Sequence, residues 1–438
     1  MSDVQLIWPN KDLVLCASGS TDYQWVQPND HRMRNSLKFE TIGACSLDAK
    51  PNVLAIGDGL DVLESLNTGT SLFEGGIRLV YIDPPFNTNA GVRQYNDTMN
   101  RSMWLSMIRD RLMAIRPLLA DDASVWVHLD DAEVHRARAV MDEIFGEQAF
   151  VASVVWQKKN TRDSRAAFST NHDTILVYAP NGPRKWKTSR NLLAKDTAQL
   201  VNKDDDPRGP WVDAPFTAPG YRSGQQYQIV TPTGRILRPP RGRSWYATET
   251  TFQTLLADGR IWFPKGGDGS PRLKLFSHQL RGLVPFTVWG SSDTGTNDDA
   301  KRHLMTLFPD REVFETPKPE LLLERVIHIA TNPGDLVVDI FGGSGTSAAV
   351  AHKMRRRWIV AERNAKTVLD FLLPRLQHVT NGTDPGGITE TTSWIGGGSF
   401  EVVHVSPRFG KPLRSDTLGA IEQCLANSAI QKEFSNVC

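Results

Sequence analysis

The sequence predicts an α/β fold, with a doubly wound, mostly parallel sheet and a smaller inserted domain. Three observations support this prediction. Strand and helix patterns alternate over residues 51–180, and the same alternation returns over residues 306–380. Between these parts, over residues 181–305, the strand patterns become short and Gly, Pro and Arg become frequent. Because such alternation is typical of parallel sheets, we expect the middle segment to interrupt a single sheet domain.

The first part of the chain is predicted to contribute strands and helices in turn. Residues 52–82 have the pattern strand, helix, strand. The elements expected after them are a helix over 101–119, a strand over 123–129, a helix over 130–146 and two strands over 150–157 and 173–179. The last two strands predict an antiparallel hairpin, which would make the sheet mixed.

The second part restarts the same pattern. A helix is expected over residues 318–331, a strand, turn and helix over 335–354, and a further strand over 356–364. Residues 380–400 are rich in Gly and Thr and are expected to form a loop. The two ends of the chain are expected to be extensions of the sheet domain, over residues 1–50 and 381–438.

The composition is that of an ordinary soluble globular protein, since 40% of the 438 residues are hydrophobic and 23% are charged. No apolar run is long enough to cross a bilayer, and the first residues lack the basic and apolar segments of a secretion signal. The four cysteines form no C-x-x-C pair. These features predict a reduced, cytoplasmic protein without a structural zinc site.

The net charge of +1 hides an uneven distribution. Residues 151–300 contain 21 Lys and Arg against 13 Asp and Glu, whereas the rest of the chain contains 29 against 36. Such a basic segment is either a solvated surface or a surface that meets a polyanion. The candidates for DNA contact are four closely spaced arginines, Arg235, Arg238, Arg241 and Arg243.

A glycine-rich turn joins a strand to a helix in the second part. Gly343, Gly345 and Ala348 satisfy the pattern G-x-G-x-x-G/A, and Glu362 lies at the end of the next strand. Glycines let a ligand approach the backbone closely, and the acid can bind ribose hydroxyls. The turn therefore predicts a cofactor that contains adenosine, but it does not distinguish NAD from S-adenosylmethionine.

The strand that ends at Ile82 is followed by Asp83, Pro84, Pro85 and Phe86. The exocyclic amine of a nucleobase is a poor nucleophile, because its lone pair is delocalised into the ring. A site that methylates this amine must accept its N–H groups. Asp83 offers a carboxylate, and the fixed φ of Pro84 helps to aim a backbone carbonyl. Pro85 stiffens the turn, and Phe86 offers a ring face to a flipped base. Beside the glycine turn, this motif favours methyl transfer over a plain loop.

These two motifs, in this order, carry a resemblance to a known family. The sequence resembles the β-class adenine-N6 DNA methyltransferases, which include the modification subunits of type III restriction-modification systems. In that class the catalytic motif precedes the target-recognition domain, and the cofactor motif comes last. Here D-P-P-F stands at 83–86 and F-G-G-S-G-T at 341–346, on either side of the basic segment. Further segments that resemble the family are 104–112, 128–146 and 315–327.

The resemblance implies a fold, a cofactor and residue roles. The fold would be a seven-stranded Rossmann-like methyltransferase sheet with residues 181–305 as the target-recognition domain. Asp83, Pro84, Pro85 and Phe86 would hold and stack the target adenine. The cofactor would be S-adenosylmethionine. The residues implied to bind it are Asp58, Thr316, Lys318, Asp339, Phe341, Gly342, Gly343, Ser344, Gly345 and Glu362.

Within this set, the glycine turn would surround the methionine part of the cofactor, and Glu362 would bind the ribose. Asp58 would lie near the adenine, and Thr316 and Lys318 would line the other side. Phe86 and Gly343 stand where many relatives carry Tyr and Ala, and both keep the required chemistry.

Alternative functions remain open at this point. Cytosine-N4 methyltransferases use a closely similar motif, although they often carry Ser at the position of Asp83. A dinucleotide-dependent oxidoreductase and a non-catalytic DNA-binding specificity subunit are the alternatives from other classes. No cysteine follows a proline, so the Pro-Cys nucleophile of cytosine-C5 methyltransferases is absent and direct transfer to an amine is favoured.

Two groups of residues resemble metal sites. His128 and His135 lie near several acids, but we expect the end of a strand and an acidic helix start there. Asp48 and Lys50 resemble half of a nuclease motif without a well-placed partner acid. The expected reaction requires no metal.

The expected partners follow from the resemblance. Double-stranded DNA would be the substrate, a homodimer is what the resemblance suggests, and a restriction subunit is a possible partner. No membrane association is expected. The sequence does not indicate which DNA site is recognised.

Overall fold

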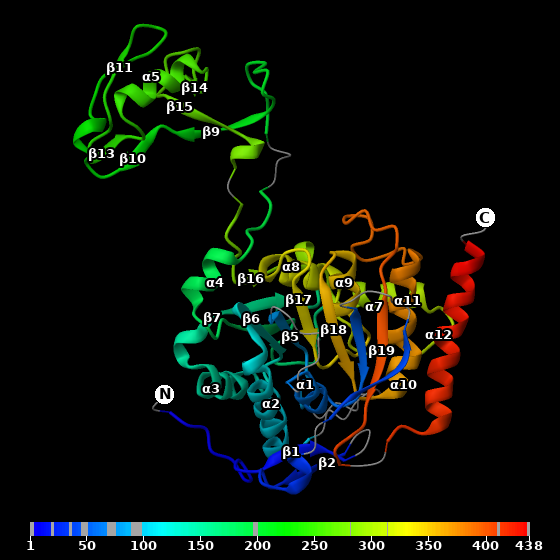
Figure 1. Cartoon of the computed structure of the whole chain (residues 1–438). Helices are drawn as coiled ribbons and strands as arrows, with labels where there is room; N and C mark the ends of the chain where they lie inside the picture. Colours follow the sequence, from blue (N-terminus) through cyan, green and yellow to red (C-terminus); the bar gives the residue numbers. More distant parts are fainter. Residues whose placement is uncertain are drawn as a thin grey trace. The chain divides into compact units, whose positions relative to one another are not determined.

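The computed structural model describes residues 4–18, 22–34, 37–44, 51–67, 76–88, 99–195, 200–280, 282–312, 314–409 and 412–435. The chain forms two compact units (Figure 1). Unit 1 comprises Met1–Asn191 and Phe286–Cys438, and unit 2 comprises Leu192–Pro285. Asp48 and Lys50 lie outside the described residues.

Unit 1 is built around one large sheet. Among the described residues its strand order is β16-β7-β8-β6-β5-β17-β18-β4-β19-β3. Neighbours from β6 to β19 are parallel, β8 is antiparallel to both of its neighbours, and β3 is antiparallel to β19. The strands are β3 (Phe39–Ala44), β4 (Asn52–Ile56), β5 (Ile77–Ile82), β6 (Leu119–Leu129), β7 (Phe150–Gln157), β8 (His172–Tyr178), β16 (Val288–Trp289), β17 (Leu336–Asp339), β18 (Arg357–Glu362) and β19 (Phe400–Val405).

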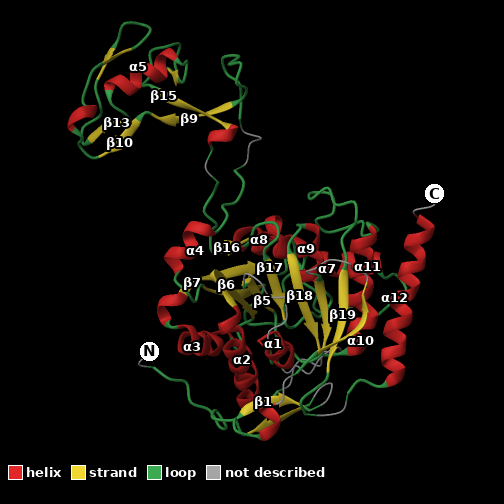
Figure 2. Cartoon of the chain, in the orientation of Figure 1, coloured by secondary structure: helices red, strands yellow, loops and turns green. Residues whose placement is uncertain are grey.

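Helices cover the sheet on both faces, as Figure 2 shows for the strands and helices of unit 1. Along β4 and β5, alternate residues such as Val53, Ala55, Val80 and Ile82 share a core with α1 (Gly59–Asn67), α2 (Arg101–Ile115) and α3 (Val134–Phe145). The other face packs against α8 (Glu320–Ala330) and α9 (Thr346–Lys353), and α11 (Leu373–Asn381) packs on α9. Every residue of β5 and β17 is buried, as expected for strands covered on both sides.

The remaining elements of unit 1 are shorter or lie at its margins. They are β1 (Val14–Ala17), β2 (Tyr23–Val26), α4 (Pro183–Ser189), α6 (Ser291–Thr294), α7 (Asn297–Leu307), α10 (Ala365–Thr367) and α12 (Ser415–Ser435). No helix in the described ranges combines the length and the apolar character that a membrane span requires.

Unit 2 consists of short strands and one longer helix around its own aromatic core. Its elements are β9 (Trp211–Pro215), β10 (Thr217–Pro219), β11 (Ile229–Val230), β12 (Ile236–Leu237), β13 (Arg243–Trp245), α5 (Glu249–Ala257), β14 (Ile261–Trp262) and β15 (Arg272–Phe276). Phe216, Trp245 and Phe252 are buried at its centre. Leu193 and Leu283 form an isolated antiparallel bridge, so the two ends of the unit lie side by side.

Most of the predicted architecture is confirmed. The sheet is α/β and mostly parallel, with helices on both faces, and the hairpin expected at 150–157 and 173–179 is the pair β7 and β8. The short strands expected in the middle segment are present, and the loop expected at 380–400 is found at residues 382–399, between α11 and β19.

The number of strands and the segment boundaries require correction. The sheet has ten strands in the described residues instead of seven. β3 and β19 come from the segments expected to be extensions, and β16 comes from the segment expected to be inserted. The compact inserted unit is Leu192–Pro285, shorter than the expected 181–305. β16 was missed because it has only two residues. β3 and β19 were missed because they pair with each other although they lie more than three hundred residues apart in the sequence.

Candidate active site

The carboxyl ends of four neighbouring parallel strands meet at one pocket of about 1200 Å³, including the open space at its mouth. Each strand contributes an acid to the lining. Asp58 follows β4, Asp83 follows β5, Asp339 ends β17 and Glu362 ends β18. Open α/β sheets bind ligands at this edge. The structure therefore brings together acids that the sequence analysis assigned to two separate motifs.

The segment Asp83–Phe86 lines this pocket and is held from behind. The indole N–H of Trp104 donates to the carbonyl oxygen of Pro85 at 2.6 Å. The next residue, Asn87, has a φ of 60° and donates to the buried carboxylate of Glu133 at 3.0 Å. These contacts hold the Asp83–Phe86 loop in place, and the hydrogen bond from Trp104 occupies the carbonyl oxygen of Pro85. Neither Trp104 nor Glu133 was predicted as part of the site.

Asp83 has two oxygens in different environments. Oδ2 lies 2.6 Å from the ammonium nitrogen of Lys318, whose side chain is 7% exposed. Oδ1 is buried and has no hydrogen-bond partner among the described residues. The Lys318 ammonium also lies 5.0 Å from the centre of the Phe86 ring. A buried acceptor without a donor is costly, so Oδ1 is suited to receive an N–H group from a ligand.

Behind Phe86 lies a buried polar group that the sequence analysis took for the end of a strand. The imidazole of His128 stacks on the Phe86 ring, with centroids 6.0 Å apart and an interplanar angle of 24°. Its nitrogens lie 2.7 Å from the hydroxyl of Tyr81 and 3.2 Å from Asp173. Burial, and then the charge of Lys318, lower the pKa of His128. His128 thus supports the ring, whereas His135 is exposed.

The glycine turn lies across the pocket between β17 and α9. The backbone N–H of Gly343 donates to Glu362 Oε2 at 2.9 Å, and the N–H of Asn364 donates to Oε1 at 2.7 Å. Burial raises the pKa of Glu362. Phe341, Gly342, Gly343 and Ser344 line the pocket as predicted.

Asp339 stands at the start of the turn and is fully buried. It accepts a hydrogen bond from the N–H of Phe341 at 2.9 Å and another from the hydroxyl of Ser347. Burial raises the pKa of Asp339 to about 7. Its position beside the pocket agrees with the expectation, and its two contacts show that it also shapes the turn.

Gly345 is the exception in the predicted set, because it does not line the pocket. Its φ is +79°, in the left-handed region, and it caps the start of α9. A Cβ at this position would meet Leu372 Cγ at 3.1 Å, away from the ligand space. At Gly343, by contrast, a Cβ would meet Phe314 of the pocket wall at 3.3 Å. Gly345 therefore serves the backbone of the turn.

Asp58 lies at the opposite end of the pocket in a buried ion pair. Its two oxygens lie 2.6 and 2.7 Å from the same guanidinium nitrogen of Arg111. Tyr23 also lines the pocket, and the Arg363 guanidinium lies 4.3 Å from the centre of its ring. Thr316 and Lys318 line the remaining wall.

Arg111 and Tyr23 were not predicted to belong to the site. A signal for Arg111 existed, since it stands three residues after the buried Ile108 and four before the buried Ile115. Because that helix face is buried, a charged side chain on it requires a partner of opposite charge.

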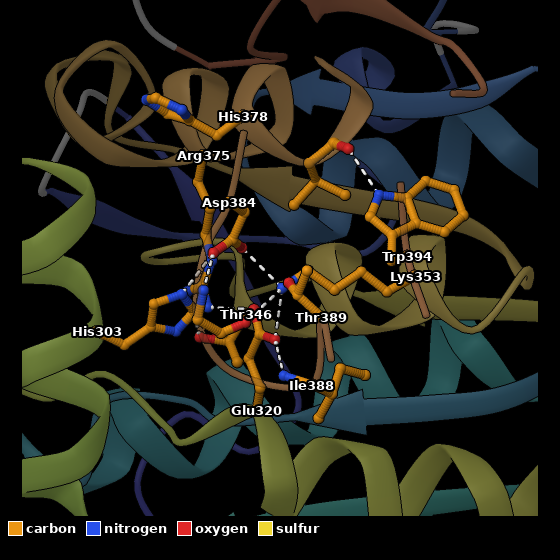
Figure 3. A network of polar contacts seen from close by, with 12 residues as sticks. His303, Glu320, Thr346, Lys353, Arg375, His378, Asp384, Ile388, Thr389 and Trp394 are labelled. Carbon is orange, nitrogen blue, oxygen red and sulfur yellow. Dashed lines mark hydrogen bonds and ion pairs between the residues drawn. The ribbon is translucent and has the colours of Figure 1, made fainter. Parts of the chain in front are cut away.

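A buried network of ion pairs contacts Thr346, the residue that follows the glycine turn at the start of α9 (Figure 3). Arg375 donates to the Thr346 hydroxyl at 2.8 Å and to Glu320 at 2.9 Å. The ammonium of Lys353 lies 2.7 Å from both Glu320 and Asp384. Although His303, Glu320 and Asp384 are grouped closely enough to hold a metal ion, Lys353 supplies a positive charge to both carboxylates.

The four arginines predicted to contact DNA are in unit 2 and differ in their surroundings. Arg235 lies 3.3 Å from Asp268, and Arg243 donates to the hydroxyl and the carbonyl of Thr217. Arg238 faces the side-chain amide of Gln228. Arg241 is exposed and makes no ion pair or hydrogen bond with its side chain among the described residues. Arg241 is therefore the arginine most available to a ligand.

Comparison with known proteins identifies the family. The model of the N6 and N4 methylase family, described as DNA methylase, matches residues 77–371, which is more than half of the chain. The chain belongs to this family. The match includes the Asp83–Phe86 loop, the glycine turn and all of unit 2.

Individual relatives agree with this assignment. The chain is 32% identical over 331 residues to the StyLTI Mod subunit, a type III restriction-modification enzyme of Salmonella typhimurium, in a match that covers 68% of this chain and 49% of that relative. It is 28% identical to the type II methyltransferase M.EcaI of Enterobacter cloacae, over 67% of this chain and 64% of the relative. The chain thus spans about half to two thirds of the length of these relatives.

Solved structures give a more distant likeness. The PvuII DNA methyltransferase, described as cytosine-N4-specific, aligns with a TM-score of 0.41 and 17% identity, covering 75% of this chain and 90% of that chain. Values this low carry no argument about the reaction or the base.

Proposed function

We propose that this protein transfers a methyl group from S-adenosylmethionine to the exocyclic N6 amine of a flipped adenine in double-stranded DNA. The observation that carries the proposal is Asp83 Oδ1, a buried acceptor without a donor in the same pocket as the glycine turn. Family membership supports the reaction class, and the pocket offers the acids and close backbone approach that an adenosine-containing cofactor requires.

Different residues would contact the two ligands, which are the cofactor and the target base. Glu362 would bind the ribose hydroxyls, the turn from Phe341 to Ser344 would surround the amino acid part, and Asp58 would lie nearest the adenine. S-adenosylmethionine, when bound, supplies an electrophilic methyl group. Asp83 Oδ1 would accept an N–H of the target amine, and the Phe86 ring would stack on the flipped base.

The proposal of adenine over cytosine rests on the residue at position 83. The family description covers both N6 and N4 methylation, so cytosine-N4 is the second candidate. A carboxylate at position 83 favours adenine, because the cytosine enzymes often carry Ser there. Long-read sequencing of DNA from a host that expresses the chain tests both the base and the site, with Asp83→Ala as the control. Modified cytosines would establish the alternative, and unmodified DNA would contradict the proposal.

A titration with S-adenosylmethionine and with NAD tests the cofactor independently. Binding of S-adenosylmethionine alone is expected, and calorimetry on the purified chain measures it. A preference for NAD would overturn the assignment of the pocket.

We further propose that unit 2 is the target-recognition domain and that it binds the DNA. A restriction subunit is a proposed partner, since relatives are named as Mod subunits of restriction-modification enzymes. A homodimer is proposed from the family resemblance alone. A cytoplasmic location fits a DNA substrate. Light scattering of the purified chain, with and without DNA, tests the dimer.

A further inference from the structure

Lys318 reaches the catalytic loop from a distant part of the sequence. It lies in the segment before α8, and its backbone oxygen accepts a hydrogen bond from the Thr346 hydroxyl at 3.2 Å. Its side chain crosses to Asp83, 235 residues away, where the ammonium lies 2.6 Å from Oδ2. The contact is largely shielded, since the side chains are 7% and 21% exposed. Lys318 thus connects the cofactor turn to the proposed acceptor site.

Several titratable groups lie near the carboxylate of Asp83 or the ammonium of Lys318. The titratable groups that interact with Asp83 or with Lys318 come from four strands or their ends: Tyr81, His128, Asp173 and Asp339. Burial lowers the pKa of His128, and Asp339 adds an acid close to Asp83. Among the described residues, Lys318 is the cation in direct contact with the Asp83 carboxylate.

We propose that Lys318 is a positioning residue that acts through Asp83. Its ammonium holds Oδ2 and leaves the buried Oδ1 as the acceptor for the target amine. This inference rests on the proposed function. It changes the role expected from the sequence, where Lys318 was assigned to the cofactor wall.

The competing role predicts different measurements. A residue that only lines the cofactor would, when replaced, weaken binding of S-adenosylmethionine and leave turnover with saturating cofactor unchanged. A residue that holds Asp83 would do the reverse, because the acceptor carboxylate loses its fixed position. The two roles are therefore separated by a binding constant and a turnover number measured on the same variant.

The experiment compares Lys318→Met and Lys318→Arg with the wild-type chain. For Lys318→Met, kcat with saturating S-adenosylmethionine should fall by about tenfold to a hundredfold, because the acceptor carboxylate is no longer held in place. Its affinity for S-adenosylmethionine, measured by calorimetry, should change less than about threefold. Lys318→Arg should restore part of the lost turnover, since it keeps a charged donor for Oδ2. Lys11→Met is the matched control, because Lys11 lies 2.7 Å from Glu143 and does not line the pocket.

Thermal melting provides a second test that does not depend on activity. Lys318→Met should lower the melting temperature in the wild-type chain and much less in the Asp83→Asn chain, because the two residues are in contact. A single variant that fails to fold, with a double variant that folds, gives the same support. Equal losses in both backgrounds would overturn the coupling.

The two hypotheses fail in distinguishable ways. If the wild-type chain transfers no methyl group to any DNA, the proposed function is wrong. If transfer occurs but Lys318→Met keeps the wild-type turnover, or loses cofactor affinity instead, only the role of Lys318 is wrong.

Discussion

Asp83 is the residue on which the proposed chemistry depends. Asp83→Ala removes the acceptor for the target amine but leaves the glycine turn intact, so transfer should be abolished while cofactor affinity stays largely unchanged. Single-turnover kinetics and calorimetry measure the two quantities. A variant that keeps more than about a tenth of the wild-type turnover, equivalent to a loss below ~1.4 kcal/mol of transition-state stabilisation, would contradict the assignment.

Asp339 should make the stability of the fold depend on pH. Burial raises its pKa to about 7 in the folded chain, against an ordinary value of about 3.9. The folded state therefore binds the proton more tightly, and its contribution to stability falls as the pH rises between these values. Relative to Asp339→Asn, the wild-type chain should lose up to about 1.4 kcal/mol per pH unit from about pH 5 to about pH 7.

Urea unfolding at several pH values measures this difference. Above about pH 8 the difference between the two proteins should become constant, because Asp339 is then ionised in both states. A difference that stays constant over the whole range would show that Asp339 is ionised in the folded chain at low pH.

At the scale of residues, sequence reasoning found most of the predicted residues in the pocket lining, but it missed Tyr23 and the residues that hold the lining in place. Asp83, Phe86 and Glu362 were found because each lies at or just after the end of a strand in a short motif. Arg111 and Glu133 were missed because their importance comes from partners that lie 53 and 46 residues away. No local pattern records such a pairing.

At the scale of elements, the turn before α9 leads us to predict a loss of stability where a loss of cofactor binding would be the simplest expectation. Gly345 was expected to bind the cofactor, but in Gly345→Val the new Cβ would face Leu372. A β-branched residue in the left-handed region is strained, so the free energy of unfolding should fall by on the order of 1–3 kcal/mol, with cofactor affinity lost only as the turn distorts.

Gly146→Val is the matched control for this turn. Gly146 also has a positive φ, +88°, and its Cβ would meet nothing within 4 Å. The variant should therefore show the backbone strain alone, and denaturant unfolding of both variants separates strain from the clash with Leu372. A larger loss at Gly146 than at Gly345 would contradict this account.

The elements themselves were largely predictable where periodicity is strong. α2, α3 and α8 begin and end within a few residues of the expected ranges. β3 was not predictable, because its burial depends on pairing with β19, which lies more than three hundred residues later in the chain. A strand at the edge of a sheet has a weaker apolar pattern than one covered on both faces.

At the scale of the whole molecule, the arginines of unit 2 predict how DNA would be bound. Arg241→Ala should weaken DNA binding and lower the salt slope by about one unit if Arg241 contacts a phosphate. If it reads a base, the cost should be roughly 1–3 kcal/mol at one position of the site. Arg235→Ala is the control, since Asp268 already pairs with Arg235.

Titration of cognate and random duplexes at several salt concentrations measures both effects. Equal behaviour of Arg241→Ala and the wild-type chain in affinity, salt slope and site preference would place the contact surface elsewhere in unit 2.

The bridge between Leu193 and Leu283 has a consequence for how such proteins diversify. Two backbone hydrogen bonds, of 2.9 and 2.8 Å, join these residues, so unit 2 leaves and re-enters unit 1 as the two arms of a hairpin would. The chain of unit 1 therefore connects to unit 2 at two adjacent points, just before Leu193 and just after Leu283. A different insert with adjacent ends could be exchanged at this point without changing the register of any strand. The choice of DNA sequence and the chemistry of transfer could then be inherited separately, and one catalytic unit could acquire new specificities by recombination at two neighbouring residues.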